Sequence, residues 1–138
     1  MQEQAAIHLP VSVRAEMIAH ATEEAPRECC GLLVGQGSNV DESVRVRNVH
    51  PSPSRYLLDP AEHIATNRRL RGTGREVIGA YHSHPHSPAV PSPVDRAEAY
   101  YSDFVWIIVS LAVEGEPAVA AYRLRGGTFV PLALLPKM

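Results

Sequence analysis

The stretch YHSHPHSPAVPSPVD, residues 81–95, concentrates side chains that can ligate a metal ion: three histidines and one aspartate among four prolines and three serines. His82 and His84 lie two residues apart, and on a strand this spacing projects both imidazoles from one face. Asp95 follows a proline-rich segment of the length needed to bring the chain back over the strand end. Two neutral imidazoles and one carboxylate match a zinc site with three protein ligands and a fourth position for water.

Each part of this pattern also has a purely structural interpretation. An HxH pair on a strand is often no metal site, and Ser92 with Asp95 could simply cap a helix that begins there. His86 stands in the loop beyond Pro85, where a solvated or supporting role is expected rather than a ligand. The combined pattern favours the metal site, because several independent coincidences would otherwise be needed.

A zinc hydrolase also needs a general base, because the metal alone lowers the pKa of its water only to about 7. Glu28 is the candidate, since it directly precedes the apolar run CCGLLVG and so stands at the mouth of a buried strand. The alternative is an ordinary surface residue after Pro26 and Arg27. The chemistry of the residues alone leaves both interpretations open.

Taken together, these residues resemble the JAMM motif of the MPN+ metallopeptidases, written E…HxH(x7)SxxD. Glu28, His82, His84, Ser92 and Asp95 fill every position of that motif. The stretches ECCGLLVG, YLLDP and WIIVSL look like the compact bacterial branch, so the similarity extends over most of the chain. The motif is highly specific because the spacing of its last four members is fixed.

The resemblance implies a fold and a chemistry. The fold would be a three-layer α/β domain related to the cytidine deaminases, with a mixed, curved β-sheet flanked by helices. Zn²⁺ would be held by His82, His84 and Asp95. Glu28 would act as general base and acid on the metal-bound water, and Ser92 would hydrogen-bond the developing oxyanion.

The resemblance also implies a substrate class. Family members cleave peptide or isopeptide bonds after the C-terminal glycine of a ubiquitin-like protein, and small bacterial relatives process sulfur-carrier proteins with a diglycine tail. Such a tail would lie extended in a groove, and residues 49–58 are a candidate for its wall. Neither the carrier nor the leaving group is specified by the sequence.

The order of elements predicts one mixed α/β domain over residues 1–138, with about six strands and three helices. In the first helix, Val11, Ala15, Ile18 and Ala21 would face the core, and Glu16, His20 and Glu23 would face solvent. Asp59 would cap the second helix and Ser92 the third. The predicted helices cover 11–26, 60–72 and 92–103, and the predicted strands cover 30–35, 43–49, 76–84, 104–111, 118–125 and 128–135.

Composition narrows the class of protein. The chain has 138 residues, 45% of them hydrophobic, and a formal net charge of -2. This charge does not indicate binding to nucleic acid or to an anionic membrane, although RRLRGTGR could form a local basic patch.

The sequence also predicts a cellular location. The N-terminal sequence shows no secretory pattern, no run is long enough to span a bilayer, and the two cysteines are adjacent, so a cytoplasmic protein is expected. The apolar C-terminal strand could bury itself in a homodimer.

Four other functions compete with the peptidase. A cysteine hydrolase could use Cys29 or Cys30, but Cys30 heads a buried run and is better explained as a core residue. A nonheme iron oxygenase also uses two histidines and a carboxylate. A zinc nucleobase deaminase requires a Cys-x-x-Cys pair, which the sequence lacks. A binding or scaffold module could keep the motif and bind a ubiquitin-like tail without turnover.

Overall fold

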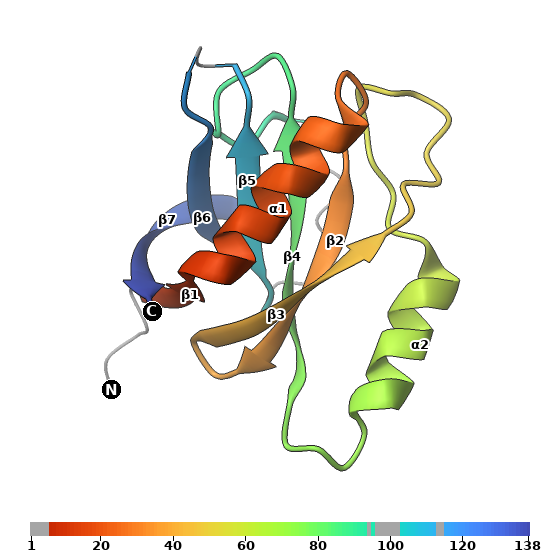
Figure 1. Cartoon of the computed structure of the whole chain (residues 1–138), viewed down its shortest axis with the longest axis vertical. Helices are drawn as coiled ribbons and strands as arrows, with labels where there is room; N and C mark the ends of the chain where they lie inside the picture. The colour runs from red at the N-terminus through yellow and green to blue at the C-terminus, as the bar shows by residue number, and fades with distance from the viewer. Residues whose placement is uncertain (1–5, 94, 96–102, 113–114) are drawn as a thin grey trace.

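The computed structural model describes residues 6–93, 95, 103–112 and 115–138 (Figure 1). Within these ranges the chain forms seven strands and two helices. In chain order they are β1 (Ala6–Pro10), α1 (Val11–Glu24), β2 (Cys30–Gln36), β3 (Asn39–Val46), α2 (Pro60–Leu70), β4 (Glu76–His84), β5 (Val105–Ser110), β6 (Ala118–Arg125) and β7 (Thr128–Lys137). The predicted helix 92–103 falls largely on 94 and 96–102, outside the described residues.

The strands form one mixed sheet in the order β1-β3-β2-β4-β5-β6-β7, closed into a barrel by pairing of β1 with both β3 and β7. β1 pairs in parallel with its two neighbours and β4 pairs in parallel with β5, whereas the other pairs are antiparallel. The predicted mixed, curved sheet is confirmed. The predicted three layers do not stand out, because the sheet closes on itself. β1 was not predicted, and it supplies the strand that completes the closure.

Helix α1 lies across one face of the sheet (Figure 1) and packs on the larger hydrophobic cluster. Its buried residues are Val13, Met17, His20 and Ala21. The predicted core face of this helix was therefore wrong in part: Val11 and Ala15 are exposed, whereas His20 is buried. The cause is a polar partner, because the His20 Nδ1 atom lies 2.7 Å from the Tyr81 hydroxyl. That hydrogen bond lets an imidazole occupy a position on the core side.

Helix α2 belongs to the other face, where a smaller cluster of Ala80, Phe104 and Trp106 is packed against partly buried apolar residues of the loop, β4 and β7. The predicted start of this helix is confirmed: the Asp59 side chain accepts a hydrogen bond from the Ala61 amide at 3.0 Å. Proline follows the cap at the first helical position. The preceding loop ends beside the segment that follows β3, where the Asp59 amide donates to the Arg47 carbonyl at 3.2 Å and Leu58 forms a bridge with Asn48.

Strand β4 is the element that positions the site. It lies between antiparallel β2 and parallel β5, and its last six residues are all buried. Tyr81 of β4 pairs with Gly31 of β2, and a Cβ atom at position 31 would overlap the Tyr81 ring. Glycine is thus required here for close approach of the two strands. Alternation along β4 sends Tyr81 to the α1 face and its neighbours Ala80 and His82 to the opposite face.

Two of the four arginines in the basic segment of residues 68–75 form ion pairs with acidic residues of β3. Arg69 lies 3.1 Å from Glu42, and Arg75 contacts both Asp41 and Glu42 at 2.6 and 2.7 Å. These pairs are partly exposed, so each contributes little to stability. Among the described residues, no helix combines the length and apolar character that crossing a membrane would require.

Candidate metal centre

His82 and His84 occupy the C-terminal end of β4. His82 pairs with Cys30 of β2 and His84 with Ser110 of β5, so the sheet fixes both backbones. Their side chains share a face of the strand, as predicted, and they are 2% and 4% exposed. The two Nε2 atoms lie 3.2 Å apart. The strand therefore presents two buried imidazole nitrogens to one point.

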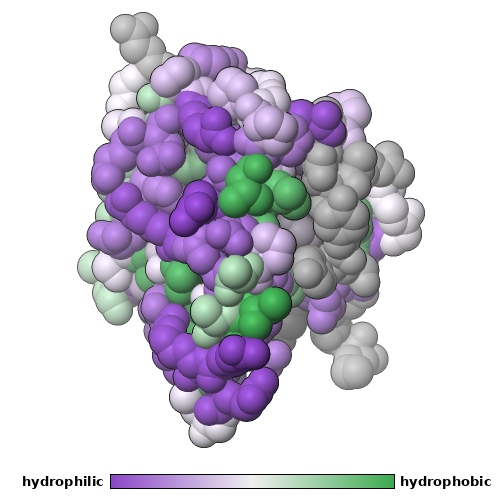
Figure 2. Space-filling model, turned by 90° about the vertical axis from the view of Figure 1, so that its right-hand side faces the viewer, coloured by the Kyte–Doolittle hydropathy of each residue, from purple (hydrophilic) through white to green (hydrophobic). Residues whose placement is uncertain are grey.

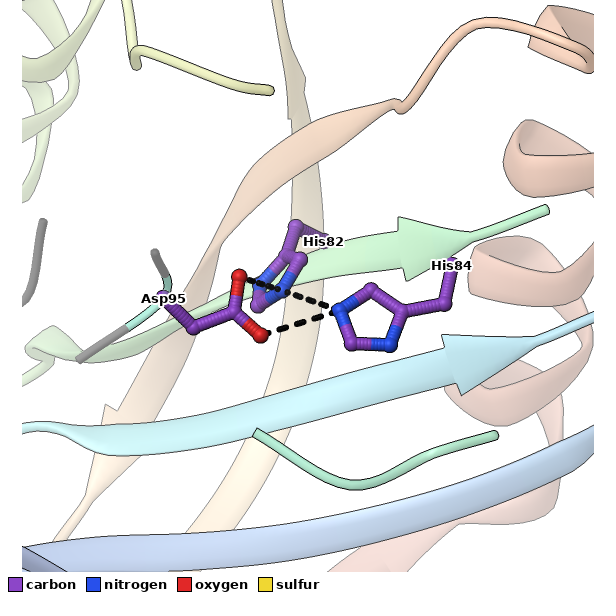
Figure 3. A group of neighbouring side chains, drawn as sticks. All are labelled: His82, His84 and Asp95. Atoms are coloured by element: carbon purple, nitrogen blue, oxygen red, sulfur yellow. Dashed lines mark hydrogen bonds and ion pairs between the residues drawn. The ribbon is translucent and has the colours of Figure 1, made fainter. Parts of the chain in front are cut away.

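Asp95 closes the cluster from outside the sheet (Figure 3). Its Oδ1 atom lies 3.0 Å from His82 Nε2, and its Oδ2 atom lies 2.9 Å from His84 Nε2. The carboxylate is placed by a reciprocal pair of hydrogen bonds: the Asp95 amide donates to Ser92 Oγ at 3.0 Å, and the Ser92 amide donates to Asp95 Oδ2 at 2.9 Å. This is the pattern of a capping box, so the predicted capping role of Ser92 agrees with the geometry.

The loop between the histidines and Asp95 is anchored to the sheet at three points. The Pro88 carbonyl lies 2.8 Å from His84 Nδ1. The Ser110 hydroxyl donates to the Ser87 carbonyl at 2.6 Å, and the Tyr122 hydroxyl donates to the Ala89 carbonyl at 2.7 Å. An Nδ1–H group that donates to a carbonyl leaves Nε2 of the same ring as the ligand atom. His84 is thus held in the tautomer that a metal site requires.

The donor set fits a zinc ion. The ligand atoms of His82, His84 and Asp95 all lie within 4.8 Å of one another, and all three side chains are buried. Burial lowers the pKa of His82, which favours the neutral imidazole that binds metals. Burial opposes ionisation of Asp95, but hydrogen bonds from the two histidines outweigh it and hold the Asp95 pKa well below its usual range. At His84 burial lowers the pKa, but the interactions with Asp95 and the Pro88 carbonyl together outweigh burial and raise the pKa.

Glu28 lines the same cavity as two members of the cluster, His84 and Asp95. A hollow of about 310 Å³ is lined by Glu28 together with His84, Ser92 and Asp95. Glu28 is 8% exposed, and its Oε1 atom has no hydrogen-bond partner among the described residues. Burial, reinforced by the nearby Asp95 carboxylate, raises the pKa of Glu28 to about 7 despite the opposing effect of His84. A buried carboxyl with a pKa near neutrality can both accept and release a proton.

The backbone around Glu28 is tied to the site from both sides. Its amide donates to the Pro53 carbonyl at 2.9 Å. The next amide, that of Cys29, donates to the Ser83 hydroxyl at 2.8 Å, and Ser83 stands between the two histidines. Sequence reasoning identified Glu28 but missed Ser83, because the hydroxyl of the central residue of HSH points away from the imidazoles.

Neither cysteine belongs to the group of potential metal ligands found among the described residues. Cys29 and Cys30 are 1% and 0% exposed, and burial raises the pKa of both thiols, that of Cys29 to about 11. The Cys30 thiol donates to the Val46 carbonyl at 3.6 Å. Buried thiols with raised pKa values are poor nucleophiles, so a cysteine hydrolase is not supported. His86 is exposed at the rim of the cavity, as predicted.

Tyr56 is a second residue near the site that was not predicted individually. Its ring stacks on His82 with the ring centroids 4.3 Å apart and the ring planes inclined by 16°. Tyr56 also lines a separate apolar hollow of about 490 Å³ between α2, β4 and β5. Figure 2 shows that apolar surface on this side of the molecule gathers in a few patches among hydrophilic side chains. The only signal for Tyr56 in the sequence was the stretch YLLDP.

The comparisons with known proteins agree with this geometry. Residues 10–125 match the family described as prokaryotic homologs of the JAB domain. The chain belongs to this family. A probable TtuB-protein conjugate cleaving protease of Thermus thermophilus is 35% identical over 130 residues, which cover 94% of this chain and 83% of the relative. A CysO-cysteine peptidase of Mycobacterium tuberculosis is 32% identical over 113 residues, or 80% of this chain and 77% of the relative.

The fold of this JAB-family chain is also similar to solved structures. The solution structure of protein DSY2949 from Desulfitobacterium hafniense superposes with a TM-score of 0.86 at 30% identity, covering 95% of this chain and 92% of that one. This similarity covers nearly the whole length of both chains.

Proposed function

We propose that this protein is a zinc-dependent peptidase that cleaves the bond after the C-terminal glycine of a ubiquitin-like or sulfur-carrier protein. Membership of the prokaryotic JAB family makes the chain a hydrolase of peptide or isopeptide bonds. The observation that supports the mechanism best is the meeting of Glu28 with His84, Ser92 and Asp95 around one small cavity.

His82, His84 and Asp95 would hold the zinc ion. Two imidazoles and one carboxylate leave one position of a tetrahedral ion for substrate or water, which is the arrangement of catalytic rather than structural zinc sites. Zinc bound there supplies Lewis acidity, which polarises a carbonyl and lowers the pKa of water. The roles of the protein side chains follow from their positions around this point.

Glu28 acts as the proton carrier. Glu28 lines the cavity, and its buried Oε1 atom lacks a hydrogen-bond partner in the described part of the chain, so the carboxylate is available to take a proton from the attacking water. The same carboxyl then gives the proton to the leaving amine. In the metal-free protein burial raises the pKa of Glu28 to about 7, so this carboxyl exchanges its proton more readily at neutral pH than an exposed one does.

Ser92 stabilises the oxyanion. Its Oγ atom accepts a hydrogen bond from the Asp95 amide, and the hydroxyl hydrogen remains to be donated to the oxygen of the scissile carbonyl. Because the capping interaction fixes Oγ before substrate arrives, no reorganisation is needed when charge develops. The hydroxyl thus serves the cap as an acceptor and the reaction as a donor.

The size and walls of the cavity support a slender substrate. A volume of about 310 Å³ accommodates a few residues of extended chain, and glycine is the residue that fills least space. Ser54, Arg55 and Tyr56 line the cavity, so part of segment 49–58 lies where the tail of the carrier would pass. The names of the Thermus and Mycobacterium relatives describe a protein conjugate and a cysteine adduct, and both leaving groups are compatible with a tail ending in glycine.

The test is cleavage of a fusion in which a diglycine-tailed carrier protein is followed by a short peptide. We expect zinc-loaded protein to release the carrier with its terminal glycine intact, as measured by mass spectrometry, and a chelator to abolish release. A carrier with valine in place of the final glycine is the control and should remain uncleaved. Tight binding of the carrier tail by zinc-loaded protein without any cleavage would instead establish a binding module.

A further inference from the structure

The imidazole of His82 is held differently from that of His84. His84 Nδ1 lies 2.8 Å from the Pro88 carbonyl, which fixes the ring. His82 Nδ1 is buried and has no hydrogen-bond partner within the described residues. Metal-ligating histidines almost always use this second nitrogen to fix ring orientation. Another interaction must therefore orient His82.

The aromatic ring of Tyr56 lies in the position where it can do so. The two rings stack at a centroid distance of 4.3 Å with nearly parallel planes. Tyr56 is 5% exposed and His82 is 2% exposed, so both stacked rings are largely shielded from solvent. Stacking restricts rotation about the His82 side-chain bonds, because turning the ring would drive its edge into the face of Tyr56.

The loop that carries Tyr56 is itself clamped, by the side chain of Asn48. The Asn48 Nδ2 atom donates to the Arg55 carbonyl at 2.9 Å, and Asn48 Oδ1 accepts from the Leu57 amide at 3.0 Å. One amide group thus holds the backbone on both sides of Tyr56. The same Nδ2 atom donates to the Glu28 carbonyl at 3.0 Å. Asn48 therefore fixes Tyr56 relative to the segment that bears the candidate base.

We propose that Tyr56 is a positioning residue, which orients the His82 imidazole for metal binding through its ring face rather than through its hydroxyl. The inference rests on the proposed function in one respect, since it assumes that His82 is a metal ligand. It predicts that the ring is required and the hydroxyl is not. It also predicts that the effect appears in metal affinity before any substrate is present.

The experiment measures zinc affinity by competition with a chromophoric chelator for the wild type and three variants. Tyr56→Phe keeps the ring and should bind zinc within about twofold of the wild type. Tyr56→Leu removes the stacking face and should weaken binding about 10-fold to 100-fold, the range found for residues that support ligands from outside the coordination sphere. Leu57→Ala, on the same loop with an exposed side chain, is the control and should bind normally.

A second readout is the absorption spectrum of the Co²⁺-substituted protein, which reports ligand geometry without substrate. We expect Tyr56→Phe to preserve the wild-type spectrum and Tyr56→Leu to alter it. Equal zinc affinity and equal spectra for Tyr56→Leu and wild type would overturn the proposal. A loss in Tyr56→Phe as large as that in Tyr56→Leu would overturn it too, because the hydroxyl would then be the active group.

A third readout covers the case in which Tyr56→Leu does not fold. In the wild-type protein the stacked geometry predicts that the carbon-bound ring protons of His82 resonate upfield of those of His84, owing to the ring current of Tyr56. Normal positions for these protons would contradict the stacking. Failure of wild-type protein to bind zinc at all would count against the proposed function instead, so the two failures are distinguishable.

Discussion

The Cys29 amide donates a hydrogen bond to the Ser83 hydroxyl at 2.8 Å, and this links the residue after the candidate base to the residue between the candidate ligands. The return contact, from the Ser83 amide to the Cys29 carbonyl at 3.1 Å, doubles the link. Ser83 is fully buried. These two hydrogen bonds, one to a side chain and one to the backbone, thus fix the position of Glu28 relative to His82 and His84.

Replacing Ser83 with alanine should make the position of Glu28 relative to the two histidines less well fixed. The change leaves the buried Cys29 amide without its acceptor, and an unsatisfied buried donor costs about 1–3 kcal/mol. We expect the free energy of unfolding to fall by that amount in urea denaturation, with a loss of kcat/KM toward a carrier fusion and with zinc content unchanged. Loss of zinc together with activity would show that Ser83 supports the ligands rather than Glu28.

Glu28→Gln should separate chemistry from metal binding. Removal of a general base typically lowers the rate by about 10²-fold to 10⁴-fold. The variant should retain one zinc per chain by atomic absorption, whereas His84→Ala should lose both zinc and activity. Undiminished turnover in Glu28→Gln would remove Glu28 from its assigned role.

The same substitution predicts a change in the pH dependence of stability of the metal-free protein. Burial raises the Glu28 pKa to about 7, so the folded state holds a proton that the unfolded state has already lost above its ordinary pKa. The folded state is therefore penalised progressively between about pH 4.5 and 7, and fully above pH 7. Glu28→Gln removes that penalty. We expect it to be more stable than wild type by on the order of 1–3 kcal/mol at pH 8 and about equally stable near pH 4, below the unfolded pKa, as measured by chemical denaturation.

Zinc should stabilise the fold through the three-residue cluster. At a free zinc concentration about 100 times the dissociation constant, binding adds about 2.7 kcal/mol to the free energy of unfolding. Thermal denaturation with and without zinc should show this gain in the wild type and in His86→Ala, whose side chain is exposed at the cavity rim. The gain should be absent in His82→Ala.

Thiol chemistry should leave the activity intact. Both cysteines are buried with raised pKa values, so a thiol reagent should modify the folded protein slowly and a chelator should inhibit it at once. Cleavage of a carrier fusion after each treatment separates a metal enzyme from a cysteine enzyme. Rapid inactivation by the thiol reagent under conditions that preserve zinc would reverse this assignment.

The parts of the site that could be predicted from the sequence are those formed by residues close together along the chain. HxH on a strand places both imidazoles on one face whatever the fold, and Ser92 with Asp95 form their reciprocal cap within four residues. These contacts depend only on neighbouring dihedral angles. For that reason their geometry could be predicted without knowledge of the tertiary structure.

Contacts between distant segments were not predictable in the same way. Tyr56 reaches His82 across 26 positions of the chain, and the pairing of β1 with β7 joins the two ends of the sheet. The buried face of α1 was misassigned because His20 is polar by type but has a buried partner, the Tyr81 hydroxyl. In each case the sequence shows the residue but not its partner, and the partner decides where the residue lies.

The absence of a side chain at Gly31 determines how closely β2 and β4 approach each other beneath the site. Gly31 carries no side chain, so the Tyr81 ring lies directly against the backbone of β2, and any larger residue at position 31 would displace the strand that bears the imidazoles. In a saturation library scored for cleavage, we therefore expect position 31 to tolerate no replacement, although Gly31 is not among the residues assigned to the metal or the substrate. The rim around His86, by contrast, should accept many replacements.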